Sequence, residues 1–400
     1  MNIAFISDHF YPGIGEVESH LLSLANEFVK LGHNVIVITR KYNSIYNGCI
    51  KMNGFLVYYL DLPIMINDVT WPMLFSGYLF YSKIFTKHKI ELVHGQQSTS
   101  TMCIEGIFHA NNMGIKTVLT DHSILEFDKP EILLLSFVSR IVFYSLDRII
   151  CVSKPGMENT QIRLKKEIDK FNIISNGIDF RIFYPHSLKG NIKSKFIDQN
   201  DKMIKILVCT RFKFRKGIDL LIKAIPLICA NKNIKIDILG DGLLKQDLIQ
   251  VIEDYELNDH VKLLGSIPFE KVPDYMKRSD ILLNTSLTEC FCMVILEGLV
   301  SGCKIVTTNV GGVDDFKKFK NVFFALPDPK DIADQIFKVS KIDVTDNYDV
   351  IIKEYDWKKI ALKTIEVYKS IEASNKKFIS AINKKLLLLL IIFMIFFNKI

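Results

Sequence analysis

The sequence predicts an α/β protein with two doubly wound, Rossmann-like domains. Strand-like and helix-like segments alternate through both halves of the chain, and this alternation is typical of parallel sheets covered by helices. A chain of 400 residues is too long for one ordinary hydrophobic core, which favours two domains. Residues 182–202 lose the alternation and contain Pro185, Gly190 and several lysines, so we expect a linker there.

The composition is that of a folded globular protein, with 49% apolar and 24% charged residues. The net charge of +7 is modest and no arginine-rich run occurs, so we expect no nucleic-acid partner. The eight cysteines are scattered, mostly in apolar runs, which is typical of reduced core residues in a cytosolic domain. The pair Cys290-x-Cys292 has no second pair or nearby histidine, so we expect no metal site.

The N-terminal domain is expected over residues 1–181. The apolar run at its start is too short for a secretory signal and lacks a basic flank. Because it leads directly into a glycine loop, we predict the first strand at Ile3–Ser7. A helix at Val17–Leu31 follows, with apolar residues three to four apart and Gly32 as its C-cap. The later predicted strands are Val35–Thr39, Val57–Leu60, Leu92–His94, Lys116–Thr120, Arg148–Val152 and Asn172–Ile174.

The C-terminal domain is expected over residues 203–355. Its predicted strands are Ile204–Thr210, Ile234–Leu239, Val261–Gly265, Ile281–Asn284, Lys304–Thr308 and Val322–Ala325. Its predicted helices are Gly217–Ala230, Leu243–Glu256, Phe269–Arg278 and Cys292–Ser301. A further helix within residues 356–375 presents an apolar face, so we expect it to pack back on the body of the protein.

The segment 384–400 is expected to be a hydrophobic membrane anchor. Leu386–Phe397 holds twelve uncharged apolar residues and follows Lys384-Lys385. As a helix it would cover roughly 18 Å, less than the roughly 30 Å of a bilayer core. We favour a short C-terminal anchor with its basic flank in the cytosol. A core or interface segment is the alternative.

Two carboxylates in residues 284–297 are the most informative pair of the chain. Glu289 follows the predicted strand Ile281–Asn284, and Glu297 lies one to two turns into the helix that comes next. Parallel sheets bind ligands at the carboxyl ends of their strands, and helix N-termini attract anions. These carboxylates are therefore candidates for gripping a ligand's hydroxyls or stabilising a developing positive charge.

Further candidates follow other predicted strands. The loop Phe10-Tyr-Pro-Gly-Ile-Gly15 allows backbone N–H groups to approach a phosphate, although a tight turn needs glycines too. In Thr210–Gly217, Arg211 and Lys216 can converge on a diphosphate; the alternative is a solvated basic loop. Gly240 fits a nucleotide-facing turn or a plain one, and His122 could bind a sugar or be structural.

Together these segments resemble the retaining GT-B glycosyltransferases of the family-4 type. The resemblance runs in collinear order from about residue 3 to 340. More narrowly, Asn284–Met293, Val57–Leu60 and Arg215–Leu220 are similar to the PIG-A subfamily, the catalytic subunits of the GPI N-acetylglucosaminyltransferase. The C-terminal apolar tail matches that subfamily too.

The resemblance implies a GT-B fold with an acceptor-side N-terminal domain, a nucleotide-sugar C-terminal domain and an interdomain cleft. It implies transfer of GlcNAc from UDP-GlcNAc to phosphatidylinositol with retention, the first step of GPI-anchor biosynthesis. The implied location is the endoplasmic reticulum membrane, with cytosolic catalytic domains, in a complex with other subunits. No cofactor or metal is implied, because arginine and lysine offset the charge of the leaving UDP.

Residue roles follow from the same resemblance. Arg211 and Lys216 would hold the diphosphate, and Glu297 the ribose. Glu289 would face the transferred sugar, and His122 would contact the hydroxyls of that sugar. The remaining implied donor-binding positions are Gly15, Glu16, Gly240, Phe291, Cys292 and Met293. No second carboxylate is suitably placed as a nucleophile, so retention would involve attack from the leaving-group side.

Two departures from the family pattern leave alternatives open. Glu16 stands where the family has a glycine, so it either swings out to solvent or weakens donor binding. The run Gly311-Gly-Val-Asp-Asp315 carries Asp where the family usually has Glu. The alternatives are a GT-B enzyme with another lipid or a soluble acceptor, an inactive donor-binding scaffold protein, and a nucleotide-sugar epimerase.

Overall fold

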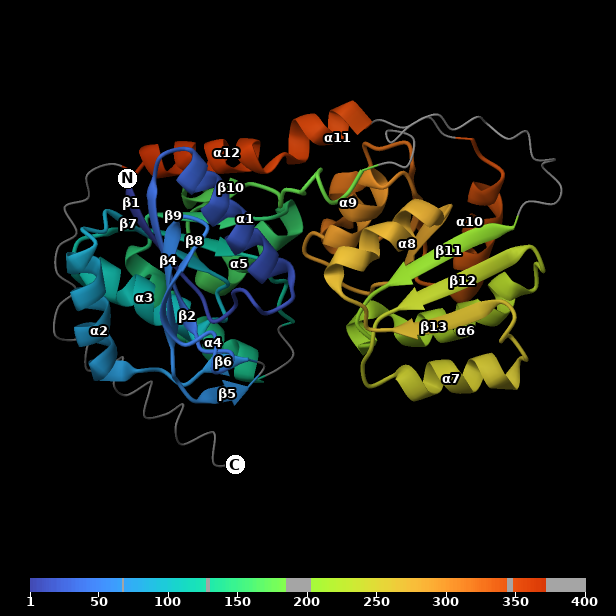
Figure 1. The fold of residues 1–400 in the computed structure, drawn as a ribbon, viewed down its shortest axis with the longest axis horizontal. Coiled ribbons are helices and arrows are strands. Elements are labelled where there is room, and N and C mark those ends of the chain that lie inside the picture. Colours follow the sequence, from blue (N-terminus) through green and yellow to red (C-terminus); the bar gives the residue numbers. More distant parts are fainter. Residues whose placement is uncertain (67, 127–129, 185–202, 344–347, 372–400) are drawn as a thin grey trace. The chain divides into compact units, whose positions relative to one another are not determined.

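The computed structural model describes residues 1–66, 68–126, 130–184, 203–343 and 348–371. The chain forms two compact units (Figure 1). Among the described residues, unit 1 is Met1–Asn176 together with Trp357–Ile371, and unit 2 lies within Gly177–Asp356. Most of the expected linker and all of the expected anchor, at 185–202 and 384–400, lie outside the described residues.

Unit 1 is built on a sheet whose described strands run in the order β10-β9-β8-β7-β1-β2-β4-β3. Neighbouring strands are parallel except for β3, which pairs antiparallel with β4 at the edge. The strands are β1 Asn2–Ile6, β2 Asn34–Arg40, β3 Gly48–Met52, β4 Phe55–Leu60, β7 Leu92–Gln96, β8 Lys116–Asp121, β9 Arg148–Cys151 and β10 Phe171–Ile173. A separate hairpin joins β5 Ile64–Ile66 to β6 Val69–Thr70.

Helices cover both faces of this sheet (Figure 1). Buried residues of α1 and α12 pack on one face, and buried residues of α2, α3 and α4 pack on the other. The helices are α1 Glu16–Lys30, α2 Leu74–Lys87, α3 Thr101–Asn112, α4 Pro130–Val142, α5 Lys154–Leu164 and α12 Trp357–Lys369, with 3-10 turns η1 Phe143–Ser145 and η2 Ile168–Lys170. Unit 1 thus needs a helix from the far end of the chain to complete one face of its core.

Local sequence explains where α1 begins and ends. Its buried residues Leu21, Leu24, Ala25 and Phe28 repeat at helical spacing and form the face that packs on the sheet. Gly32 adopts φ 81°, and the N–H of the next residue donates to the carbonyl of Phe28 at 3.0 Å. This left-handed glycine satisfies carbonyls at the end of the helix, which confirms the predicted C-cap.

Unit 2 is built on a parallel sheet with the described strand order β13-β12-β11-β14-β15-β16. The strands are β11 Ile204–Cys209, β12 Ile234–Leu239, β13 Val261–Gly265, β14 Ile281–Asn284, β15 Lys304–Thr308 and β16 Val322–Ala325. The helices are α6 Ile218–Cys229, α7 Lys245–Asp254, α8 Val272–Arg278, α9 Met293–Val300, α10 Pro329–Ser340 and α11 Tyr348–Tyr355, with 3-10 turns η4 Phe214–Lys216, η5 Phe269–Lys271 and η6 Gly311–Phe316. Buried residues of α6, α7 and α10 share one core with the sheet.

The two parallel α/β units confirm the predicted fold class. Most predicted strands coincide with observed ones to within a residue or two. The edge strand β3 was not predicted, and it is the one antiparallel member of the described sheet of unit 1. Within the described residues, no helix combines the length and the apolar character needed to cross a bilayer.

Candidate active site

In each unit the predicted site residues lie beyond the carboxyl ends of parallel strands. In unit 2, Arg211 and Lys216 follow β11, Gly240 follows β12, and Glu289 follows β14. In unit 1, Glu16 begins α1 and His122 follows β8. Parallel sheets expose the carboxyl ends of their strands to ligands, so both groups occupy the expected edge of their sheet.

An ion pair between Lys216 and Glu289 is the centre of the unit 2 group. The Lys216 ammonium contacts Glu289 Oε1, and Ser286 Oγ donates to the same oxygen at 2.6 Å. The two charged side chains are 16% and 8% exposed. A buried carboxylate is tolerated when a cation and a hydroxyl both bind it, so this arrangement fixes the position of Glu289.

Gly217 lets the basic loop pack closely on the segment that carries Glu289. Its φ is 65°, and a Cβ there would overlap the carbonyl oxygen of Thr285. Thr285 Oγ1 donates to the Lys216 carbonyl at 3.1 Å, and the Leu287 N–H donates to the Arg215 carbonyl at 2.9 Å. The backbone of one loop therefore positions the lysine of the other.

Two more glycines allow close backbone approach in unit 2. A Cβ on Gly240 would overlap the Thr210 carbonyl oxygen, and a Cβ on Gly311 would overlap the Glu289 carbonyl oxygen. The N–H of Gly312 donates to that Glu289 carbonyl at 2.8 Å. The backbone at Glu289 is thus held from the β15 side as well.

The start of α9 carries the remaining predicted positions. Phe291 is fully buried, Cys292 is the N-cap with φ 64°, and Met293 is the first helical residue. Glu297 lies in the second turn, and its charge adds to burial in raising the pKa of Cys209 to about 12. Arg211 is exposed.

The unit 1 group is a chain of polar contacts around Glu16. Asn176 Nδ2 donates to Glu16 Oε1 at 2.7 Å, and His122 Nδ1 lies 3.5 Å from the same oxygen. His20 Nδ1 donates to Asn176 Oδ1 at 2.7 Å, and His122 Nε2 donates to Gln96 Oε1 at 3.0 Å. Glu16 is therefore turned inward onto Asn176 and His122, and it does not swing out to solvent.

Two buried histidines beside this group, His20 and His94, have lowered pKa values. Burial, and then the charge of His122, lower the pKa of His20 well below its ordinary value. The same two causes lower the pKa of His94 to about 3. His122 is itself only 2% exposed at its side chain. A hydroxyl could therefore reach its Nδ1 only after a shift of Glu16.

The loop before α1 carries negative charge at the helix N-terminus. Glu16 and Glu18 lie in the first turn, and a Cβ on Gly15 would overlap the Glu18 carboxylate. The start of α1 therefore already has carboxylates of its own chain beside it. This makes it a poorer phosphate site than the basic loop of unit 2.

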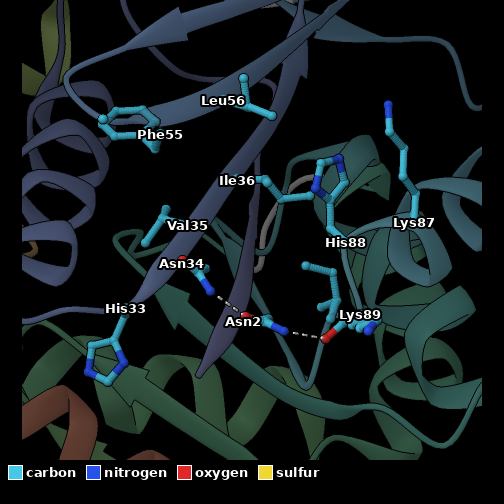
Figure 2. Close-up of a pocket in the computed structure, with 12 residues that line it drawn as sticks. Asn2, His33, Asn34, Val35, Ile36, Phe55, Leu56, Lys87, His88 and Lys89 are labelled. Atoms are coloured by element: carbon cyan, nitrogen blue, oxygen red, sulfur yellow. Dashed lines mark hydrogen bonds between the residues drawn. The ribbon is translucent and has the colours of Figure 1, made fainter.

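A pocket of about 340 Å³ lies at the amino ends of the strands β1 and β2, at the opposite end of these strands from the candidate site. Figure 2 shows Asn2 and Asn34, from the starts of β1 and β2, bonded to each other, and Asn2 bonded to the Lys89 carbonyl. The lining includes no predicted site residue. The described residues also contain no cluster of three His, Cys, Asp or Glu side chains with the geometry of a metal site.

Sequence reasoning missed three residues that position the candidate groups: Asn176, Gln96 and Ser286. Each follows or ends a strand, which is the signal that could have found it. Ser286 also stands three residues before Glu289. Asn176 bonds Glu16 and His20 of α1, and Gln96 bonds His122 after β8, so these two residues join segments that are far apart in sequence.

Comparisons with known proteins cover nearly the whole chain. The sequence profile of "Glycosyl transferases group 1" matches residues 191–356, and that of "PIGA (GPI anchor biosynthesis)" matches residues 44–129. The phosphatidylinositol N-acetylglucosaminyltransferase GPI3 subunit of Saccharomyces cerevisiae is 34% identical over 382 residues, 94% of this chain and 84% of the relative. The chain belongs to the GPI3/PIG-A family.

Relatives from a plant and from human also match over most of the chain. The phosphatidylinositol N-acetylglucosaminyltransferase subunit from Arabidopsis thaliana is 33% identical, covering 94% of this chain and 83% of the relative. The human relative, named for the same transferase, is 33% identical, covering 92% and 75%. The chain is accordingly a glycosyltransferase by family.

Solved structures agree on the fold. Sucrose-phosphate synthase from Thermosynechococcus elongatus matches with a TM-score of 0.72 at 18% identity, covering 92% of this chain and 98% of the other. HepE of Anabaena in complex with UDP-glucose matches with a TM-score of 0.69 at 18% identity, covering 92% and 100%. The fold is that of the GT-B glycosyltransferases.

Proposed function

We propose that this chain transfers N-acetylglucosamine from UDP-GlcNAc to phosphatidylinositol with retention, the first step of GPI-anchor biosynthesis. The observation that carries the proposal is the identity of 33–34% over 92–94% of the chain to relatives named for this transfer. A match of this breadth spans both units.

The unit 2 cluster supplies the chemistry that a UDP leaving group needs. Departure of UDP leaves negative charge on the diphosphate, and preorganised cations lower the barrier by stabilising it. Lys216 has three N–H donors, so it can bind a phosphate oxygen without leaving Glu289. Arg211 is exposed and can add a bidentate contact. Glu297 is proposed to bind the ribose.

Glu289 is proposed to face the transferred sugar. Lys216 and Ser286 hold its carboxylate in one position, where it can stabilise an oxocarbenium-like centre. The N–H groups from Phe291 to Met293 are proposed to meet the sugar or phosphate, with Gly240 in the nucleotide-facing turn. No second carboxylate is assigned as a nucleophile, so the acceptor attacks from the side that UDP leaves.

In unit 1, His122 is proposed to contact hydroxyls of the sugar. This contact requires Glu16 to release His122 Nδ1, because the carboxylate lies 3.5 Å from that nitrogen. Donor binding and Glu16 thus compete for the same imidazole. Gly15 and Glu16 are therefore proposed to face the donor.

The chain is further proposed to act at the endoplasmic reticulum membrane within a complex of other subunits, with its catalytic units in the cytosol. The relatives are named as subunits of a phosphatidylinositol-dependent transferase, which supports a membrane and partner chains. The proposed C-terminal anchor lies outside the described residues.

The test uses membranes from cells that express the full chain with its partner subunits. Labelled UDP-GlcNAc and phosphatidylinositol should yield GlcNAc-phosphatidylinositol with an α linkage, measured by lipid chromatography and by glycosidase digestion. Lys216→Ala and Glu289→Ala should abolish the product. Lys245→Ala is the matched control, because Lys245 pairs with Asp241 at an exposed position of the same unit.

Each result bears on a different part of the proposal. Normal activity of both Lys216→Ala and Glu289→Ala would refute the site assignment. Wild-type protein that is inert while Glu16→Gly is active would favour a donor-binding scaffold protein.

The proposed reaction needs no metal, because Arg211 and Lys216 offset the charge of the diphosphate. Transfer should therefore persist when the same membranes are treated with a strong chelator. Activity lost to the chelator and restored by a divalent cation would contradict this part of the proposal.

A further inference from the structure

An apolar stripe runs along α4 and the turn that follows it. Leu133, Phe137 and Tyr144 are 53%, 47% and 72% exposed. They stand four and seven residues apart, so they follow one side of the helix. The opposite side of α4, with Val138 and Val142, is buried in the core of unit 1.

The stripe continues onto the end of α5. Arg140 Nε donates to the Arg163 carbonyl, at 2.5 Å, and Arg140 NH2 donates to the Ile162 carbonyl at 3.4 Å. The Ile162 side chain is 61% exposed. Arg140 thus ties α4 to the end of α5, and both helices expose large apolar side chains that the fold does not bury.

Basic side chains border this surface. Lys166 Nζ donates to the Tyr144 carbonyl and lies 5.1 Å from the centre of the Tyr144 ring. Lys170 is close enough to Lys166 that its charge, after burial, lowers the pKa of Lys166. Within residues 165–170, the three lysines outnumber the two carboxylates, Glu167 and Asp169.

We propose that the α4 apolar stripe, consisting of Leu133, Phe137, Tyr144 and Ile162, rests on an anionic phospholipid surface with the neighbouring lysines at the headgroups. Apolar side chains that enter the acyl boundary, flanked by lysines, are the chemistry of interfacial membrane binding. The inference rests on the proposed function, because that proposal supplies a phospholipid acceptor and therefore a bilayer.

The charge pattern favours lipid over a protein partner. Protein interfaces are usually depleted in lysine. Here Lys165, Lys166 and Lys170 follow Ile162 closely in sequence, and Lys166 contacts Tyr144, so these lysines can meet phosphates of phosphatidylinositol while Phe137 enters the apolar layer. Such a contact would hold unit 1 against the membrane that carries its acceptor.

The experiment places a photoreactive benzoylphenylalanine at Phe137 in the full chain with its partner subunits. The complex is reconstituted into phosphatidylcholine vesicles with and without phosphatidylinositol, irradiated, and adducts are identified by mass. Lipid adducts should form, and more of them with phosphatidylinositol present. The same reporter at Leu362 is the matched control, since Leu362 is 43% exposed on α12, over the opposite face of the sheet.

Substitutions on the surface should change the lipid contact without unfolding the protein. With the reporter at Tyr144, Phe137→Glu should lower lipid adducts by about tenfold, since a large apolar side chain is lost from the lipid boundary. Lys165→Glu should lower them by about fivefold or more, whereas Lys363→Glu on α12 should not. Unfolding temperatures should match wild type, because these side chains are exposed.

The outcomes separate this inference from the proposed function. Adducts with a partner protein in place of lipid, or equal lipid adducts from Phe137 and Leu362, would overturn the membrane surface. If transfer to phosphatidylinositol persists in that case, the proposed function stands. Lipid adducts from Phe137 without any transfer would support the surface and contradict the function.

Discussion

The loops that follow the first strand of each unit occupy the same place in the fold and carry opposite charge. The loop before α1 in unit 1 ends in Gly15 and leads into Glu16 and Glu18. The loop before α6 in unit 2 contains Arg211, Lys213, Arg215 and Lys216. The two units thus have the same strand-loop-helix arrangement here, but the segment after the first strand is acidic in unit 1 and basic in unit 2.

The backbone of the two loops is also fixed differently. In unit 1, tyrosine hydroxyls hold the loop: the Phe10 N–H donates to Tyr42 Oη at 2.8 Å, and Tyr59 Oη donates to the Tyr11 carbonyl at 2.9 Å. In unit 2, Gly217 packs backbone against backbone at Thr285. We therefore expect a diphosphate to bind at the basic loop of unit 2 rather than at the acidic loop of unit 1.

The largest effect is expected at the Lys216–Glu289 pair. Lys216→Met leaves a buried carboxylate without its cation, so unfolding free energy should fall by about 3 kcal/mol or more, and the transfer rate by at least about 100-fold. Urea unfolding and the transferase assay measure the two effects. Adding Glu289→Gln to Lys216→Met should restore part of the lost unfolding free energy, because the unpaired charge is removed. The double variant should not regain transferase activity.

An exposed pair in unit 1 is the control for stability. Lys41 and Asp61 are 30% and 70% exposed, so Lys41→Met should change the unfolding free energy by less than about 1 kcal/mol. Equal losses for Lys41→Met and Lys216→Met would contradict the special role of the buried pair.

The glycines should differ nearly as much. Gly217→Ala places a Cβ on the Thr285 carbonyl oxygen at a left-handed φ, which should cost about 3 kcal/mol of unfolding free energy. Gly15→Ala meets only the end of the Glu18 side chain, and its φ of 177° is ordinary extended backbone. It should cost under about 1 kcal/mol by urea unfolding. A similar loss in both variants would show that the two loops are not constrained differently.

Acid should act on unit 1 through a buried histidine of α3. Burial lowers the pKa of His109 to about 4, and its Nδ1 has no partner among the described residues. The folded state therefore favours neutral His109. Its contribution to the unfolding free energy is fully present above pH 6.5 and is lost as pH falls towards 4. At pH 5 the loss is about 2 kcal/mol.

His109→Phe tests this acid effect. The ring stacks on Tyr81 with centroids 5.5 Å apart, and phenylalanine can keep that contact. Between pH 7.5 and pH 5, the unfolding free energy of the variant should fall by about 2 kcal/mol less than that of the wild type. Urea unfolding at each pH measures the difference. Identical pH dependence in the two proteins would remove His109 as the cause.

The smallest effect is expected at Glu16. Its carboxylate accepts from Asn176, and Glu16→Gln keeps an oxygen for that bond, so stability should change by under about 1 kcal/mol. A second variant, Glu16→Gly, removes the negative charge from the loop that is proposed to face the donor. It should lower the KM for UDP-GlcNAc by about fivefold. An unchanged KM would mean that Glu16 does not meet the donor.

The sequence predicts well what depends on local pattern. Ile281–Asn284 is a fully buried run, and its predicted bounds match β14. The edge strand β3 was missed because Gly48–Met52 is mostly exposed and shows no apolar run. Its signal was Asn53-Gly54, whose φ values of 47° and 91° form the turn of a hairpin with β4.

Pairings within the candidate groups could not be predicted in the same way. Lys216 and Glu289 are 73 residues apart and meet because β14 lies beside β11 rather than after β13. Glu16 and Asn176 meet across 160 residues. Such contacts are set by strand order, which periodicity does not encode.

The helix α12 makes unit 1 a product of both ends of the chain. Its Tyr368 hydroxyl bonds His94 Nδ1 at 2.6 Å, and its Trp357 ring lies 5.3 Å from the His20 ring. During synthesis, unit 2 is complete once Asp356 has emerged, whereas unit 1 still has an uncovered apolar face over α1 and the sheet. The half made first therefore finishes folding last, and a nascent chain that stops before residue 357 presents that face to chaperones.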